Sequence, residues 1–200
     1  SNLEALNSAL LELKDCDEIM CLGDVCHFGA DTNACFDTLL NLKNFSMVKG
    51  NHDAYSNKLF LGNYEAKNEL ESYTEYMFNR TNSEYQAYIR NLPYVVSRNI
   101  NGTRIAFTHF KWVTSNETAA VPDLPIKTQD LKNIFSEIEA EIVFFGHTHY
   151  SQDNKSHKNS DGGIIRYINF GPLGTPHVSP AMARCGALEI NDKGDVRVEM

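Results

Sequence analysis

Short apolar runs that lead directly into polar turns recur along the chain. They are largely β-branched or aromatic, a pattern that predicts buried strands. The clearest runs lie at 19–22, 45–48, 105–107 and 142–145. Further strands are expected near 164–169, 184–190 and 195–199. The stretch 151–163 is rich in Ser, Asn, Asp, Lys and Gly, so it is expected to be an exposed loop.

Apolar residues also recur at helical spacing. Leu3, Leu6, Leu10 and Leu13 follow one another at intervals of three or four residues, which predicts an amphipathic helix over residues 1–14. Further helices are expected over 31–43, over 127–140 and, in two pieces, over 64–90. Strands that alternate with helices indicate an α/β fold.

Glycine-containing turns complete the picture of the sheet. Gly102 and the pair Gly162-Gly163 are typical of hairpin turns, so part of the sheet is expected to be antiparallel. The chain shows no internal repeat, low-complexity tract or linker. We therefore expect one domain that spans residues 1–200.

The charge of the chain narrows the classes of partner. The formal net charge is −8 with histidine neutral, which argues against a nucleic-acid groove, because such a groove needs a basic face. A small phosphorylated or nucleotide substrate is compatible with this charge, since bound metal ions supply positive charge locally. No apolar run approaches the about 20 residues that cross a bilayer, so no contact with a membrane is expected.

The cysteines give a weaker indication of the compartment. There are five, an odd number, and none forms a C-x-x-C pair, which argues against a structural zinc knuckle. Reduced and mostly buried thiols in a cytoplasmic protein are the expected state. No secretory signal is visible in the printed sequence.

Polar clusters follow the four clearest strands, and ligands of open α/β sheets gather at the carboxyl ends of strands. The clusters are Gly23-Asp24, Gly50-Asn51-His52-Asp53, Thr108-His109 and Gly146-His147-Thr148-His149. Each alone is a weak signal, because a Gly-Asp pair is usually a turn and a lone histidine is usually structural. Together they combine carboxylate, amide and imidazole donors, which suit Mn, Fe, Zn or Ni. Two such ions about 3.5–4 Å apart can hold the attacking and leaving oxygens of a displacement at phosphorus.

The order of these motifs resembles the calcineurin-like metallophosphoesterase superfamily. Residues 22–31 are most similar to its small bacterial phosphodiesterase branch. Residues 169–174 resemble the Asn-Pro-Gly-Ser-x-Gly segment of that branch, with Phe170 in place of the proline. The resemblance implies a four-layer α-β-β-α sandwich of mixed sheets and a phosphoesterase that uses two divalent metal ions.

The resemblance also implies a role for each residue of the motifs. Asp24 would bridge the two metals, and His149 would hold the first. Asn51, His109 and His147 would hold the second. A metal-bridging hydroxide would attack phosphorus, because the ions depress the pKa of water. His52 would protonate the leaving oxygen, and Asp53 would orient His52.

The match departs from the family at the start of the sequence. The family opens with a strand that ends in Asp-x-His, two further ligands of the first metal, and the resemblance places that strand before Ser1. The fold is therefore expected with its N-terminal strand missing from the printed sequence. We expect these 200 residues to bind one metal well and the other poorly.

Several other residues leave alternatives open. His27 is either an additional contact or a loop residue, and the loop is favoured. His157 is expected to be solvated in the polar stretch, whereas His177 is a weaker candidate for a substrate contact. Trp112 could stack on a base, although packing is the more ordinary role for a tryptophan.

Two functions follow from this pattern. The first is an enzyme that hydrolyses a phosphodiester, a phosphomonoester or a dinucleoside polyphosphate. The second is a non-catalytic scaffold, because the retromer complex uses a subunit of this fold for binding. A scaffold has no need of a proton donor, so the imidazole of His52 favours the enzyme.

Overall fold

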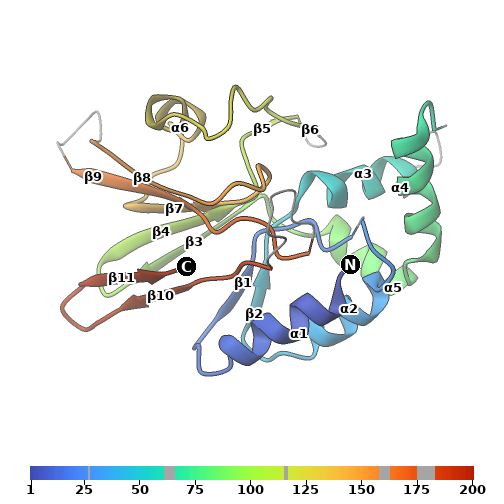
Figure 1. Cartoon of the computed structure of the whole chain (residues 1–200), viewed down its shortest axis with the longest axis horizontal. Helices are drawn as coiled ribbons and strands as arrows, with labels where there is room; N and C mark the ends of the chain where they lie inside the picture. Colours follow the sequence, from blue (N-terminus) through green and yellow to red (C-terminus); the bar gives the residue numbers. More distant parts are fainter. Residues whose placement is uncertain (27, 61–65, 115–116, 158–162, 175–182) are drawn as a thin grey trace.

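A five-stranded mixed sheet organises the computed structural model, which describes residues 1–26, 28–60, 66–114, 117–157, 163–174 and 183–200 (Figure 1). Its strands follow the order β3-β4-β7-β9-β8. Their bounds are Val95–Ile100 for β3, Thr103–Thr108 for β4, Ile142–Phe145 for β7, Ile164–Asn169 for β9 and Gln152–His157 for β8. The three central strands, β4, β7 and β9, are parallel, so their carboxyl ends lie at one edge of the sheet.

The two outer strands of this sheet are antiparallel. The β3–β4 hairpin turns at Asn101-Gly102, where both residues have positive φ as this kind of tight turn requires. The β8–β9 pair corrects the sequence prediction, which placed an exposed loop at 151–163. Residues 152–157 form an edge strand that main-chain hydrogen bonds hold to β9, and an edge strand carries polar and charged side chains without penalty.

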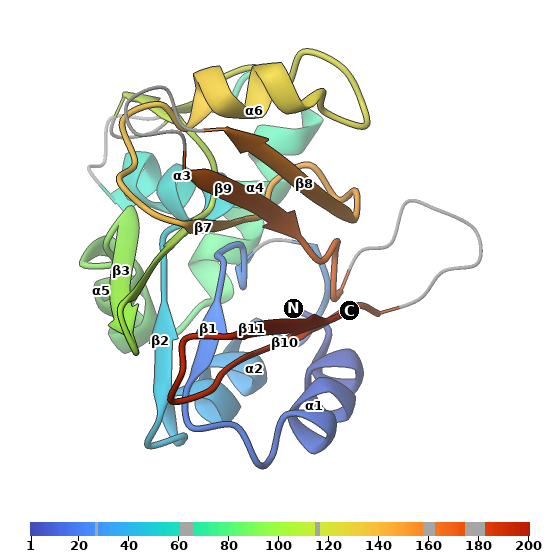
Figure 2. The same cartoon turned by 90° about the vertical axis from the view of Figure 1, so that its left-hand side faces the viewer.

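A second, two-stranded parallel sheet joins β1 (Ile19–Cys21) to β2 (Phe45–Met47). Helices α1 (Leu3–Glu12) and α2 (Thr32–Leu40) lie against it, as Figure 2 shows. Phe36 and Leu39 of α2 form one buried core with Leu6 of α1 and Met47 of β2. These four elements confirm the strands and helices predicted for the first quarter of the chain.

One helix covers one face of the five-stranded sheet. Helix α6 (Thr128–Ile134) is shorter than the predicted 127–140, yet Leu131 and the following Phe135 are buried against the sheet. On the opposite face, the hairpin of β10 (Ala187–Ile190) and β11 (Val196–Glu199) packs on Ile105, Ile142 and Ile168. Among the described residues, no helix has the length and apolar character needed to cross a membrane.

Three further helices and a small hairpin flank the strand ends (Figure 1). They are α3 (Asn51–Phe60), α4 (Glu69–Arg80) and α5 (Ser83–Arg90), together with the hairpin of β5 (Trp112–Thr114) and β6 (Glu117–Thr118). The two helical pieces predicted over 64–90 correspond to α4 and α5. The result is an α/β fold with a mixed central sheet, as predicted, while the stacking in four layers stays a prediction.

Candidate metal centre

The polar residues that follow four strands meet at one place. Asp24 lies just beyond β1, Asn51 begins α3 after β2, His109 follows β4, and His147 follows β7. The side-chain oxygen of Asn51 lies 2.8 Å from Nε2 of His109 and 2.8 Å from Nδ1 of His147. Oδ2 of Asp24 lies 3.1 Å from the same Nε2 of His109. Four of the five predicted metal ligands are therefore in direct contact.

The hydrogen bonds of His109 show which of its nitrogens presents a lone pair to this cluster. Its Nδ1 lies 2.7 Å from the carbonyl oxygen of Leu22 and donates a hydrogen to it. In the neutral ring, Nε2 then carries a lone pair, and it faces the oxygens of Asp24 and Asn51, which can only accept. Three acceptors that meet in this way require a positive charge among them, either a proton on Nε2 or a metal cation.

The pKa values show how the metal-free chain supplies this charge. Burial opposes ionisation of both partners, but the contact between Asp24 and His109 outweighs it, raising the pKa of His109 and lowering that of Asp24. Burial and the positive charge of His109 lower the pKa of His147 to about 4, so this imidazole is neutral at pH 7. A neutral imidazole and an ionised carboxylate are the forms that bind metals. The donor set therefore fits a divalent cation.

Asp53 lies underneath this cluster and is completely buried. One oxygen of its carboxylate accepts hydrogen bonds from the backbone N–H groups of Asp24 at 2.8 Å and Gly50 at 2.9 Å. The other accepts from Cys26 at 3.4 Å. Burial and the nearby charge of Asp24 raise the pKa of Asp53 to about 6. Asp53 thus fixes the loop after β1 to the loop after β2, and its orientation of His52 stays a prediction.

His52 lies beside the cluster at the start of α3. Its backbone N–H donates to Oδ1 of Asp24 at 2.9 Å, and its ring meets Phe28 edge to face with 5.8 Å between centroids. Burial lowers the pKa of His52, and the charge of Asp24 offsets only part of this effect. The half-buried imidazole of His52 thus lies next to the predicted ligands and packs against the ring of Phe28.

The backbone at the site has conformations that side chains rarely adopt. Among the described residues, four other than glycine have positive φ, and three of them are predicted ligands: Asp24 at 59°, His147 at 68° and His149 at 51°. Such conformations cost energy and are concentrated at functional sites. His149 follows His147 in the same turn, and its contact with a metal stays a prediction.

Two glycines allow the loops after β1 and β2 to approach each other. A Cβ atom on Gly23 would lie 2.6 Å from the backbone nitrogen of Gly50, and φ of Gly23 is +101°. A Cβ atom on Gly50 would overlap the carboxylate of Asp24. The Gly-Asp and Gly-Asn-His-Asp motifs therefore need glycine because the two backbones pass too closely for any side chain.

We expect Gly50→Ala to displace Asp24 and to destabilise the metal-free protein by about 2 kcal/mol, the usual cost of overpacking a buried position. Thermal unfolding in a chelator measures the stability, and titration with Mn²⁺ measures the weakened metal affinity. Gly174→Ala is the matched control, because a Cβ atom there would meet only Cβ of Asn2, at 3.3 Å. Unchanged metal affinity in Gly50→Ala would contradict the proposed packing.

Asn169 is a site residue that the sequence reasoning did not assign. Its side-chain amide donates to the carbonyl of Gly146 and to the hydroxyl of Thr148, both at 3.0 Å, and it is buried. It therefore holds the turn that carries His147 and His149. The sequence does indicate this position, because Asn169 ends an apolar strand and each predicted ligand also follows an apolar strand.

None of the remaining candidate residues that the structure describes is part of this cluster. His157 is exposed on β8, as expected for a solvated residue, although in a strand. Trp112 is half-buried, and its ring lies 4.7 Å from that of Tyr94, which agrees with packing. His27 and His177 lie outside the described residues. The five cysteines are free thiols, and two of them, Cys26 and Cys35, are buried.

Within the described part of the chain, no three side chains of His, Cys, Asp and Glu are arranged to hold an ion by themselves. The amide of Asn51 lies at the centre of the cluster instead, between the two imidazoles. The family model described as the calcineurin-like phosphoesterase superfamily domain matches residues 1–193. The chain belongs to this superfamily.

Several known proteins are similar to this chain over most of its length. An uncharacterised protein of Methanocaldococcus jannaschii is 29% identical, over 88% of this chain and 73% of that protein. A hypothetical protein of Pyrococcus horikoshii has the same fold with a TM-score of 0.71 at 18% identity, covering 98% of this chain and 81% of its own. A metallophosphoesterase of Sphaerobacter thermophilus gives a TM-score of 0.69 at 20% identity, over 99% and 83%. At these identities the solved structures show the fold alone.

Proposed function

We propose that this protein is a phosphoesterase that hydrolyses a phosphodiester, a phosphomonoester or a dinucleoside polyphosphate with two divalent metal ions. The observation that supports it most directly is that His109 and His147 both contact the amide oxygen of Asn51, while Asp24 contacts His109. Membership of a phosphoesterase superfamily adds to this support.

The proposed metal ligands are Asp24, Asn51, His109, His147 and His149, and Mn, Fe, Zn or Ni all suit this set. Two bound ions would neutralise charge on the phosphate and make water a better nucleophile at neutral pH. The protein fixes the donors beforehand. The carbonyl of Leu22 sets the tautomer of His109, Asp53 joins the loops of Asp24 and Asn51, and Asn169 holds the turn of His147.

His52 is the proposed general acid. Its ring lies beside Phe28 at the start of α3, and its backbone N–H donates to Asp24. The imidazole is therefore placed to give its proton to the leaving oxygen of a substrate on the metals, and such proton transfer contributes about 10²–10⁴-fold to a rate. Asp53 is a positioning residue in this proposal, because its described hydrogen bonds go to the backbone.

A non-catalytic scaffold is the second candidate. The observation that separates the two is His52, because a scaffold gains nothing from a half-buried imidazole at the edge of a metal site. The acidic charge favours a small substrate over a nucleic acid. The free cysteine thiols suit a reducing compartment, so the proposal includes a cytoplasmic location.

Turnover by the full-length protein with Mn²⁺, including the strand expected before Ser1, tests the proposal. The panel consists of bis-p-nitrophenyl phosphate, p-nitrophenyl phosphate, cyclic nucleotides and diadenosine tetraphosphate. We expect hydrolysis of at least one of them, its loss in a chelator and its recovery on addition of Mn²⁺. Metal binding without turnover of any of these substrates would favour the scaffold instead.

A further inference from the structure

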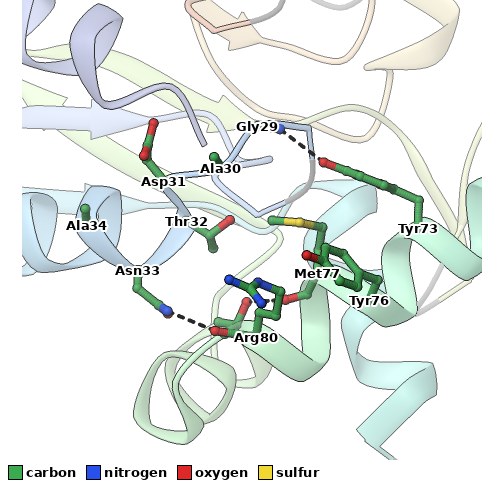
Figure 3. Close-up of a pocket in the computed structure, with 11 residues that line it drawn as sticks. Gly29, Ala30, Asp31, Thr32, Asn33, Ala34, Tyr73, Tyr76, Met77 and Arg80 are labelled. Carbon is green, nitrogen blue, oxygen red and sulfur yellow. Dashed lines mark hydrogen bonds between the residues drawn. The ribbon is translucent and has the colours of Figure 1, made fainter.

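A cavity of about 510 Å³ lies between the start of α2 and the face of α4 (Figure 3). Residues 29–34 form one wall, and Tyr73, Tyr76, Met77 and Arg80 of α4 form the other. The volume is in the range of sites for small molecules. None of these residues has a part in the proposed chemistry at the metals.

Two side chains hold the walls of this cavity together. The amide of Asn33 on α2 donates to the carbonyl of Arg80 at 2.9 Å and accepts from the backbone N–H of Asn82 at 2.9 Å. The hydroxyl of Tyr73 accepts from the backbone N–H of Gly29 at 3.3 Å. The shape of the cavity is therefore formed before any ligand binds.

A row of aromatic rings joins the cavity to the metal site. The ring of Phe28 meets His52 edge to face at 5.8 Å and stacks on Tyr73 at 5.7 Å with 20° between the planes. Tyr73 lies 6.5 Å from Tyr76. Phe28 is 45% exposed and Tyr76 is 56% exposed, although rings of this size are usually buried. The row thus offers open aromatic surface from the proposed proton donor into the cavity.

Arg80 gives the cavity a positive charge at its far end. Its guanidinium lies over the ring of Tyr76, 5.4 Å from the centroid, and the side chain is exposed. Asp31 also lines the cavity, but Figure 3 shows its carboxylate on the α2 side, away from the guanidinium. The planar guanidinium can bind two oxygens of a phosphate group at once.

We propose that this cavity binds the distal part of the substrate, a nucleoside phosphate, with its base on the aromatic row and its phosphate on Arg80. The inference rests on the proposed function, since the scissile phosphate would lie at the metals next to His52. Aromatic rings stack on any nucleobase, and a guanidinium beside them selects for an attached phosphate. A sugar phosphate or a phospholipid headgroup has no flat π-face to stack on the rings, whereas a nucleobase has one. The substrate class is therefore a nucleotide with more than one phosphate.

Binding of adenosine 5′-monophosphate, measured by calorimetry, is the first test because it does not depend on turnover. We expect Tyr76→Ala and Arg80→Ala each to weaken binding about 10-fold, while Tyr76→Phe retains it. Arg197→Ala removes an exposed arginine from β11 and should have no effect. Ala34→Trp fills the cavity without a change of charge and should weaken binding as well. Equal binding by the wild type, Tyr76→Ala and Arg80→Ala would overturn the proposal.

The second test compares two substrates in the same variants. We expect Tyr76→Ala and Arg80→Ala to raise the KM for diadenosine tetraphosphate about 10-fold and to leave kcat/KM for bis-p-nitrophenyl phosphate within about 2-fold. Equal losses for both substrates would show a structural role and overturn the proposal. Failure of the wild type to hydrolyse any substrate of the panel would refute the proposed function, whereas hydrolysis of both substrates without any effect of the variants would refute only the cavity.

Discussion

Replacement of His52 by alanine should slow turnover by about 10²–10⁴-fold, the usual contribution of a general acid. The effect should be largest with an alkoxide leaving group, which must be protonated as it departs, and smallest with p-nitrophenolate, which leaves readily as an anion. Metal binding should change little. The backbone N–H of His52 donates to Asp24, and alanine keeps this group.

Rates for an alkyl and a p-nitrophenyl ester, together with the metal content of each protein, measure these effects. His157→Ala is the matched control, because it removes an exposed imidazole from β8. Loss of bound metal in His52→Ala would show that the residue is a ligand. Slowing by the same factor with both leaving groups would show that its proton is not used in the departure of the alcohol.

Asn51→Ala should weaken the binding of Mn²⁺ by about 10-fold or more. The amide oxygen of Asn51 contacts both His109 and His147, so its removal leaves a buried and a half-buried imidazole without their common partner. The metal-free protein should also lose about 1–3 kcal/mol of stability, because buried polar atoms would be unsatisfied.

Calorimetric titration with Mn²⁺ and thermal unfolding in a chelator separate the two effects of Asn51→Ala. Asn7→Ala serves as the control, since this asparagine is exposed on α1. Wild-type affinity for the tightest ion in Asn51→Ala would remove this residue from the ligand set. His147→Ala should likewise weaken metal binding before it affects the rate at saturating metal.

The location of the site was predictable from the sequence for a simple reason. Apolar runs that end in Asp24, Asn51, His109 and His147 define buried strands and, at the same time, the carboxyl ends at which polar residues meet. The side-chain pattern is enough for this inference, because parallel pairing of β1 with β2 and of β4 with β7 brings those ends together.

Other features depend on contacts that no pattern of side chains reveals. Strand β8 is polar, and its main-chain hydrogen bonds to β9 hold it in the sheet. The hydrogen bonds by which Asp53 joins two loops are not visible in the sequence, and its orientation of His52 stays a prediction. The cavity beside α4 was also invisible in the sequence, because the rings of Phe28 and Tyr73 meet only when distant segments pack together.

The hydrogen bonds of Asp53 have a consequence for how the protein would acquire the proposed metals. They tie the Asp24 loop to the Asn51 loop through protein atoms alone, so assembly of the donor set does not wait for a cation. Newly made chains should therefore finish folding empty and take up ions afterwards. Stripping the ions should switch activity off and leave the fold standing, so that loading and unloading can be cycled on the same molecules.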